Sequence, residues 1–388
     1  MGLATAYTFL HLCPSLSLCV CEKEEAVGQH QSSHNSGVIH TGVYYPPGSQ
    51  KAKNCTRGRQ LLLRFCDEHH VAYRTCGKVI VATEVSEVPY LNTLAERAKQ
   101  NGVSIEPLDR EALKKREPYV RGVEALEVFD AGVIRFKDVC QKLSELIHKR
   151  GGVVRCGATL RSASYHNRTW SLTTAAGVMK TKRVITCAGL YSDRVAQLFG
   201  HRPSLRIIPF RGEYYTLTQE AAKFCQSLIY PVPHPLYPFL GVHLTRTLDG
   251  MVECGPSAVL AFSREGYTKS DVSLGDMREV LGSGRFWKMA AQHWKFGVSE
   301  MATSFFKDRF VRAVQKLVPE VRSEHLVPGG SGVRAQTVAS DGSLVGDFVI
   351  EEDRGVLHLL NAPSPAATSC FAIAEELYER SEKSLHNS

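Results

Sequence analysis

Residues 31–45, QSSHNSGVIHTGVYY, decide how the rest of the chain is interpreted. This stretch places two histidines, His34 and His40, beside an asparagine, three serines, two glycines and the short apolar run Val38-Ile39. Glycine lets the main chain approach a flat polar ligand closely, and the polar side chains can bond to it. The pattern favours a loop that presses against a cofactor. A polar turn before a half-buried strand is an equally simple interpretation.

The composition sets limits on the classes of protein that fit. A chain of 388 residues is longer than one hydrophobic core usually serves, which predicts two domains. The net charge of +8 comes from scattered basic residues, which argues against a nucleic-acid partner and leaves an anionic ligand open. The twelve cysteines include no C-x-x-C pair, so we predict thiols in a reducing compartment and no metal site.

The first 24 residues predict a helix, then an apolar strand, then an acid. Residues 2–12 have helical character, Pro14 ends the helix, and residues 16–21 form a strand that closes on Glu22. This order is typical of the second half of a dinucleotide-binding unit, with Gly2 as the last glycine of its G-x-G-x-x-G turn. The first strand and the two earlier glycines of the unit would then be missing. Many apolar strands also end in glutamate, so an ordinary strand remains the alternative.

Two later segments have the form of strand ends that contact a ligand. Residues 183–189 predict a buried strand that ends at Ala188-Gly189, just before a helix. Residues 361–368 run directly into the last predicted helix, whose start leaves free N–H groups and a partial positive charge. An ordinary strand-to-helix turn is the alternative for the first of these segments.

Residues 201–325 change in character, with clustered prolines, long strands and frequent aromatics. Together with roughly 46–137, this region predicts a second domain that covers the cofactor. A helix over 285–310 is expected to bury Trp287 and Trp294 in the core. The candidate polar groups of the region are Arg211, Tyr214, Tyr215, His243 and Arg246. Each of these residue types is more often a surface residue, or one hydrogen-bonded within the protein, than a ligand-binding residue.

Several long strings, spread over the chain, resemble the flavin-dependent amine and hydroxy-acid oxidoreductases of the D-amino-acid-oxidase superfamily. They include HNSGVIHTGVYYPPGSQKAK (34–53), TCAGLYSDR (186–194), PFRGEYY (209–215), GVRAQ (332–336) and LLNAPSPAATS (359–369). The resemblance implies an α/β fold with an FAD-binding Rossmann-like domain and an α+β substrate domain on a mixed sheet. The first domain would be discontinuous (1–45, 138–200 and 326–388), and the second would comprise 46–137 and 201–325.

The resemblance also implies positions for FAD. Gly2, Glu22 and Lys23 would serve the adenosine half, whose pocket Ala188 and Gly189 would line. The other cofactor-binding positions, which would lie near the flavin ring and the pyrophosphate, are His34, Asn35, Ser36, Ser364, Pro365, Ala366 and Ala367. Without the first strand and most of the glycine turn, we expect weaker FAD binding or poorer folding.

The implied reaction is oxidation of L-2-hydroxyglutarate to 2-oxoglutarate, with hydride transfer to flavin N5. Such a reaction needs a base for the hydroxyl proton, and imidazole suits this role, with His40 first and His243 second. The dicarboxylate needs charged planar donors, so Arg334 is the first candidate for substrate binding and Arg211 the second, with Tyr215 beside it.

Other functions remain open at this point. One is a related flavin enzyme that acts on an amine or on glycerol phosphate, and another is a non-catalytic product that does not retain FAD. The resemblance implies a mitochondrial location in animals. The partners would be a small 2-hydroxy dicarboxylate and an electron acceptor of unknown identity. The sequence also leaves a peripheral contact with a membrane open.

Overall fold

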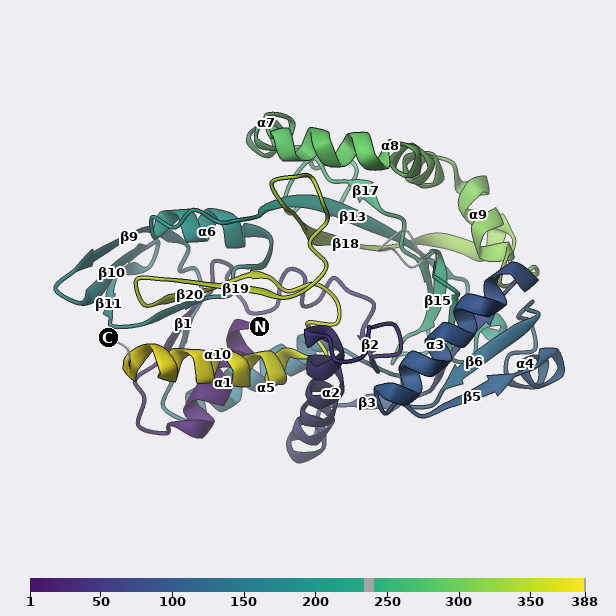
Figure 1. Cartoon of the computed structure of the whole chain (residues 1–388), viewed down its shortest axis with the longest axis horizontal. Coiled ribbons are helices and arrows are strands. Elements are labelled where there is room, and N and C mark those ends of the chain that lie inside the picture. The colour runs from purple at the N-terminus through teal and green to yellow at the C-terminus, as the bar shows by residue number, and fades with distance from the viewer. Residues whose placement is uncertain (234–240, 387–388) are drawn as a thin grey trace.

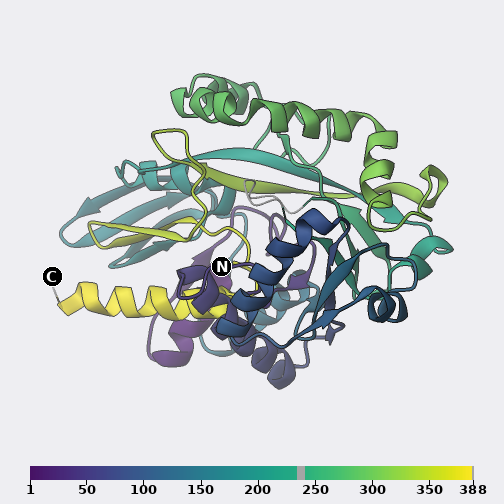
Figure 2. The same ribbon diagram turned by 45° about the vertical axis from the view of Figure 1, so that its right-hand side comes forward.

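The computed structural model describes residues 1–233 and 241–386 (Figure 1). One half of the molecule carries both chain termini and several short sheets. The other half is built on a single large sheet, with helices over its outer side (Figure 1; Figure 2). Strands and helices alternate through the chain, so the α/β class predicted from the sequence is confirmed.

The half that carries the termini contains two pairs of parallel strands. Strand β1 (Cys19–Cys21) pairs with β8 (Val153–Arg155), and β12 (Val184–Thr186) pairs with β20 (Val356–Asn361). Strand β19 (Val349–Asp353) adds to β20 in the antiparallel direction, and the β1·β8 pair forms a sheet separate from this one. A meander follows along the chain, with strands β9 (Leu160–His166), β10 (Thr169–Thr174) and β11 (Gly177–Thr181).

Five helices pack around these strands. Helix α1 (Gly2–Leu12) is apolar on nearly every side, and its side chains from Ala4 to Leu10 are buried. It packs against α5 (Phe136–Lys149) and the C-terminal helix α10 (Cys370–His386), which also contacts α2 (Gln50–His69). The short helix α6 (Ser192–Leu198) follows β12. These helices bury the apolar core of this half.

The second half is organised by a nine-stranded mixed sheet, in which β4 and β14 pair in parallel and the other neighbours are antiparallel. The strands are β4 (Lys78–Ala82), β5 (Ile105–Leu108), β6 (Glu124–Val128), β13 (Arg206–Leu217), β14 (Leu228–Pro231), β15 (His243–Arg246), β16 (Val252–Gly255), β17 (Val259–Leu260) and β18 (Leu326–Val338). Strand β18 pairs with β13 along most of its length. Residues 326–338 therefore lie in this sheet, although the sequence predicted them to belong to the cofactor-binding half.

The remaining elements connect and cover the two halves. A small sheet joins β2 (Val38–Ile39), β7 (Gly132–Ile134) and β3 (Tyr73–Thr75), so the 31–45 segment is held by later parts of the chain. Helices α3 (Val88–Gln100) and α4 (Arg110–Arg116) pack beside β4, β5 and β6.

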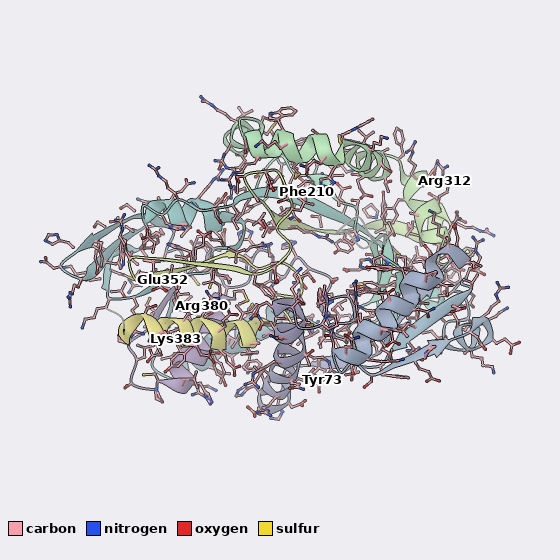
Figure 3. All side chains as sticks on the ribbon, viewed as in Figure 1. Tyr73, Phe210, Arg312, Glu352, Arg380 and Lys383 are labelled. Carbon is pink, nitrogen blue, oxygen red and sulfur yellow. The ribbon has the colours of Figure 1, made fainter. Side chains whose placement is uncertain are left out.

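The outer helices α7 (Leu274–Leu281), α8 (Gly284–Phe305) and α9 (Lys307–Gln315) lie over β13 and β18 (Figure 1). Phe210, on β13, lies beneath α8 and packs against a buried cluster that includes Phe286 and Met289 of that helix (Figure 3). The expectation that Trp287 and Trp294 lie in the core is wrong, because their exposed fractions are 57% and 60%. Within the described ranges, no helix has the length and apolar character to cross a bilayer.

Gly58 allows α2 to cross the start of α10 closely. A Cβ atom at this position would lie 2.5 Å from the Cα of Ser369 and 3.0 Å from the carbonyl oxygen of Thr368. Gly58→Ala is therefore expected to lower the free energy of unfolding by about 1–3 kcal/mol through overpacking. Urea denaturation, monitored by circular dichroism, measures this change in the free energy of unfolding. Gly284→Ala, at a helix start with open space around it, is the matched control, and equal stabilities of the two variants would contradict this packing.

Candidate functional site

A cavity of about 3130 Å³ is lined by residues from both halves of the molecule. This volume is several times the roughly 300–1,000 Å³ of a site for one small ligand, so it has room for a large cofactor together with a substrate. Of the positions predicted from the sequence, the lining residues are Gly2, Glu22, Lys23, His34, Asn35, Ser36, His40, Ala188, Gly189, His243, Arg334, Ser364, Pro365, Ala366 and Ala367.

The start of the chain forms one end of this cavity. Gly2 begins α1, which has no side-chain N-cap, so its first N–H groups are available to an anion. Glu22 directly follows β1, and one of its carboxylate oxygens accepts a hydrogen bond of 3.0 Å from the backbone N–H of Glu24. An uncapped helix start beside an acid at a strand end suits a phosphate and a ribose, respectively.

Lys23 lies in a cluster of charged groups at the same end. Its ammonium pairs with Glu24 and lies 2.7 Å from a carboxylate oxygen of Glu265, and Nε2 of His30 lies 2.9 Å from the same oxygen. Glu24, His30 and Glu265 come close enough to hold a metal ion, but the Lys23 ammonium already bonds to both carboxylates. The cluster joins the segment after β1 to the segment before α7.

The turn after β12 approaches the 31–45 segment closely. Gly189 has φ +54°, and a Cβ atom there would lie 2.7 Å from Oε1 of Gln31. This position therefore favours glycine because of its left-handed backbone conformation, since the terminal oxygen of Gln31 can move. The small residues Ala188 and Gly189 leave their backbone open to the cavity.

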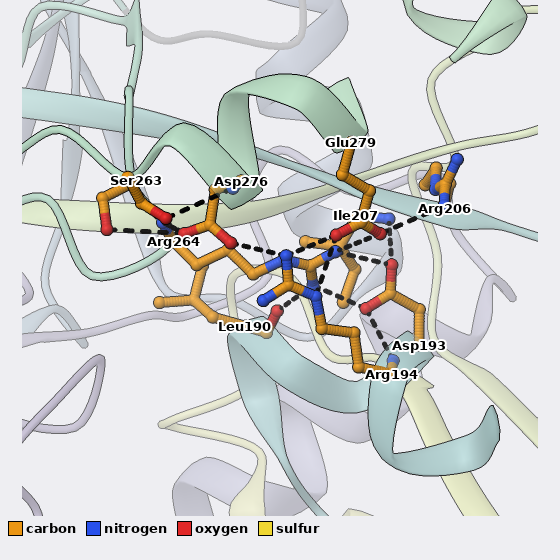
Figure 4. A network of polar contacts seen from close by, with 10 residues as sticks. Leu190, Asp193, Arg194, Arg206, Ile207, Ser263, Arg264, Asp276 and Glu279 are labelled. Carbon is orange, nitrogen blue, oxygen red and sulfur yellow. Dashed lines mark hydrogen bonds and ion pairs between the residues drawn. The ribbon is translucent and has the colours of Figure 1, made fainter. Parts of the chain in front are cut away.

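A buried ionic network holds this turn in place (Figure 4). The guanidinium of Arg264 donates to the carbonyl oxygen of Leu190 and to Asp193, each at 2.5 Å. Arg264 and Asp193 have side-chain exposures of only 2% and 3%. Arg194 extends the network to Asp276 and Glu279 of α7. The turn that lines the cavity in one half is thus tied to the helices that cover the other half.

The 31–45 segment is fixed by hydrogen bonds on both sides. Nδ1 of His34 lies 3.0 Å from the carbonyl oxygen of Ser331, and its ring stacks on Tyr267 with 4.0 Å between centroids. The Asn35 amide donates to the carbonyl oxygens of Gln31 and Ser32, both at 2.9 Å, and its oxygen accepts from the N–H of Gly37. Asn35 therefore holds the shape of the loop.

His40 is tied to the segment before α10 by its backbone and by its ring. Its N–H donates to Oγ1 of Thr368 at 3.0 Å, and its Nε2 lies 3.2 Å from Oγ of Ser364. Burial lowers the pKa of His40 to about 3, and the positive charges of Lys78, His243 and Lys51 act in the same direction. The imidazole is neutral at pH 7 and can accept a proton.

A second histidine and an arginine complete the polar end of the cavity. His243 lies on β15, where its Nδ1 is 2.9 Å from the carbonyl oxygen of Gly241 and its ring stacks on Tyr230 with 4.0 Å between centroids. Burial raises the pKa of the Tyr214 phenol. The positive charge of the nearby Arg334, on β18, opposes this rise. Arg334, Tyr214 and Tyr230 all line the cavity.

Lys78 does not line the cavity but lies behind Tyr230, which does, and the sequence alone did not point to it. It is 1% exposed, and its ammonium lies 4.2 Å from the ring centroid of Tyr230 and 5.2 Å from that of Tyr44. Burial lowers its pKa to about 8, and the charged groups that act on it among the described residues are thiols, not carboxylates. The available signal was a lysine at the start of an otherwise apolar strand, 78–82.

The structure does not bring Arg211 and Tyr215 to the cavity. Nη2 of Arg211 lies 2.9 Å from a carboxylate oxygen of Glu213, and Nη1 donates to the carbonyl oxygen of Thr268. Tyr215 packs against Phe310 in the core, with 4.7 Å between centroids. Side chains alternate along a strand, so Tyr214 reaches the cavity and its neighbour Tyr215 points the other way.

Comparison with known proteins identifies the family. The model of the FAD dependent oxidoreductase family, DAO, matches residues 1–380. The chain therefore belongs to this family, and its cofactor is FAD, as the resemblance implied. The uncapped start of α1, the acid after β1 and the close turn at Gly189 fit the phosphate and ribose groups of such a cofactor.

Within the family, the chain is similar to L-2-hydroxyglutarate dehydrogenases. The protein of that name from Indibacter alkaliphilus is 45% identical over 382 residues, which cover 98% of this chain and 96% of that protein. The one from Escherichia coli K12 is 40% identical over 98% of this chain and 90% of its own length. The human mitochondrial one is 40% identical, with coverage of 98% and 87%.

Solved structures show the same fold at lower sequence identity. The FAD-bound L-alpha-glycerophosphate oxidase from Mycoplasma pneumoniae matches with a TM-score of 0.76 at 24% identity, covering 97% of this chain and 90% of that chain. Glycine oxidase from Geobacillus kaustophilus matches with a TM-score of 0.74 at 15% identity, covering 98% and 92%. These two likenesses concern the fold alone.

The low pKa of His40 predicts a pH dependence of stability. Below about pH 6.5 the unfolded chain protonates this histidine, whereas the folded protein keeps it neutral down to about pH 3. Proton uptake by the unfolded state makes stability fall as the pH decreases through this window. His40→Gln removes this contribution, so its loss of stability between pH 7 and pH 5 is expected to be smaller than that of the original protein.

Urea unfolding of the flavin-free protein at the two pH values measures the difference. The exposed His11, replaced by glutamine, is the matched control. Burial lowers the pKa of His358 to about 4, so this histidine contributes to the pH dependence of stability in every variant. An unchanged slope in His40→Gln would show that His40 titrates normally in the folded protein.

Proposed function

We propose that this protein is an FAD-dependent dehydrogenase that oxidises L-2-hydroxyglutarate to 2-oxoglutarate. The observation that carries the proposal is 45% identity over 98% of the chain to a dehydrogenase of that name. The structure supports it with one cavity, which is lined by a neutral imidazole and by cationic groups as well as by Gly2 and Glu22. That set of groups suits a substrate with one hydroxyl and two carboxylates.

The residues that would hold FAD come from three segments of the chain. Gly2, Glu22 and Lys23 would bind the adenosine half, beside Ala188 and Gly189. The loop of His34, Asn35 and Ser36 and the segment from Ser364 to Ala367 would flank the flavin. When bound, FAD supplies a two-electron acceptor, to which a hydride can pass at N5.

His40 is the proposed base for the substrate hydroxyl. Its Nε2 faces Ser364, and its N–H bond to Thr368 fixes the orientation of the residue. A base works best when its pKa lies near the working pH, and that of His40 is far lower in the ligand-free protein. Two substrate carboxylates would add negative charge beside the ring and raise its pKa toward the useful range.

The carboxylates would be held by the cationic groups around the histidines. Arg334 offers a planar fork of donors for one of them. Lys78 lies behind Tyr230 as a buried positive charge that no carboxylate pairs with inside the described chain. A dianionic substrate would compensate this charge, which a neutral substrate cannot do. His243 remains the second candidate for the base.

The wider assignments are proposals as well. The two-domain division follows the boundaries predicted from the sequence, except that β18 is now grouped with the substrate sheet. The mitochondrial location is proposed because the names of the animal relatives include the word mitochondrial, which the names of the bacterial relatives do not. Catalytic turnover also needs an electron acceptor as a second partner. Cell fractionation tests the location, and activity assays with a panel of acceptor dyes and quinones test the electron acceptor.

The proposed function is tested with the purified full chain. Oxidised flavin gives a visible absorption spectrum, and we expect about one flavin per chain. We also expect reduction of this flavin under anaerobic conditions by L-2-hydroxyglutarate. Its D-isomer, glycine and glycerol phosphate are the controls. Bleaching by glycerol phosphate or by an amine would favour a related flavin enzyme instead, and a colourless protein that gains no activity with added FAD would support the non-catalytic alternative.

His40→Ala is expected to lower the turnover number by roughly 10²–10⁴-fold, because the hydroxyl would lose its proton acceptor. Flavin content, measured on the same preparation, should stay close to that of the original protein. Stopped-flow reduction of the flavin measures the effect on the chemical step. His243→Ala is the companion variant, and a larger loss there would move the role of base to His243.

Arg334→Lys is expected to raise the KM for L-2-hydroxyglutarate by roughly 10-fold or more, because lysine cannot form the paired hydrogen bonds of a guanidinium. The turnover number at saturation should change less. Steady-state kinetics with an artificial acceptor measures both constants. A KM equal to that of the original enzyme would remove Arg334 from the substrate site.

A further inference from the structure

Helix α8 presents a row of large apolar side chains to solvent. We call this row the α8 stripe, and it consists of Trp287, Trp294, Val298, Met301 and Phe305. Their exposed fractions are 57%, 60%, 59%, 46% and 66%, and the next residue, Phe306, is 62% exposed. Scattered exposed apolar residues are ordinary on a protein surface, but a continuous row of this kind marks an interaction surface.

The stripe is continuous because of its spacing along the helix. At about 100° per residue, its five positions fall within a sector of about 60°, and at 1.5 Å per residue they extend over roughly 27 Å. The side of α8 that faces the sheet is occupied separately, since Phe286 and Met289 pack with Ile208 and Val338 of the strands below. The helix is therefore seated on the protein, and its stripe is an additional apolar surface that the described residues leave uncovered.

Lysine side chains lie beside the stripe. Lys288 and Lys295 lie beside it on α8, and Lys295 extends over the ring of Trp294, with 5.8 Å between Nζ and the centroid. Lys269 lies in the same way over Phe305, at 5.1 Å. The single acid of α8, Glu300, is engaged by the backbone N–H of Ala258 at 2.8 Å. The outward side of α8 thus combines tryptophan and phenylalanine with lysine.

We propose that the α8 stripe docks the protein on the surface of a bilayer that contains anionic phospholipid, with α8 lying parallel to the surface. Tryptophan and phenylalanine favour the boundary between headgroups and acyl chains. Lysines beside them are attracted to anionic headgroups, and an amphipathic helix with both features binds in the plane of the interface. Figures 1 and 2 show α7 and α8 as an outer layer, on the side of β13 and β18 away from α1 and α10.

A second copy of the chain is a poorer occupant of the same surface. A two-fold interface brings the same patch of both copies together, so Lys288 and Lys295 of each copy would face those of the other. Like charges at such close range oppose association, whereas an anionic surface compensates them. The docking concerns a surface separate from the cavity, so it is independent of the substrate.

Flotation of the flavin-loaded protein with vesicles tests the proposal. We expect little binding to phosphatidylcholine alone and strong binding at low salt when about a quarter of the lipid is phosphatidylglycerol or cardiolipin. Trp294→Ser combined with Phe305→Ser should weaken the partition constant by about 10-fold or more, because two anchoring side chains are lost. Val178→Ser, at an exposed valine of β11, is the matched control and should bind like the original protein.

Tryptophan fluorescence gives a second readout that does not depend on the double variant. Besides the stripe, the only tryptophan of the chain is Trp170, which is buried at 2% exposure. In Trp287→Phe, a blue shift on addition of anionic vesicles and quenching by brominated lipid would therefore report on Trp294. Flavin content, dehydrogenase activity and melting temperature of each variant are measured in parallel, and these should match the original protein.

Three results would overturn the proposal. One is the absence of binding to anionic vesicles at low salt, with no change in Trp294 fluorescence. Another is equal vesicle binding by the double variant and the original protein. The third is a concentration-dependent dimer in sedimentation velocity, lost in the double variant, because a second copy would then cover the stripe.

Discussion

The buried ion pair between Arg264 and Asp193 is the contact on which the rest of the structure depends. Both side chains are almost fully excluded from solvent, and the same guanidinium also bonds the carbonyl oxygen of Leu190. A buried charge that loses its partner costs about 3–5 kcal/mol, so neither residue can be removed alone without a large loss. Through this pair, the turn at Gly189 and the helices over the large sheet keep one relative position, and the cavity between the two halves keeps its shape.

The cavity has two ends with different chemistry, and each end suits one half of the reaction. Gly2 and Glu22 bring backbone N–H groups and an acid that fit a nucleotide, whereas His40, His243 and Arg334 bring imidazole and positive charge, with Lys78 buried behind Tyr230. Burial, together with the nearby positive charges, keeps His40 neutral in the ligand-free protein. Substrate binding and activation of the base would then be coupled, because the same carboxylates that pair with the cations also raise the pKa of the imidazole.

Much of the site could be predicted from the sequence, and the failures have physical causes. The positions near His34, Gly189 and Ser364 were found because strand ends and glycine turns carry local signals, and the structure places all three at one cavity. Arg211 and Tyr215 do not line the cavity, which the sequence could not reveal because strand register, set by distant pairing, decides the side a residue faces. Lys78 was missed because its burial depends on Tyr44 and Tyr230. Trp287 and Trp294 were expected in the core because the periodicity of a helix does not tell a covered apolar face from an uncovered one.

Hydrogen exchange with and without bound FAD tests the central claim most directly, because it reports on every segment of the backbone in one experiment. The account predicts that FAD slows exchange at the same time in peptides covering residues 31–40, 186–192 and 362–369, which the sequence separates widely and the cavity brings together. Protection confined to one of these segments, or found only in segments that do not line the cavity, would contradict the account.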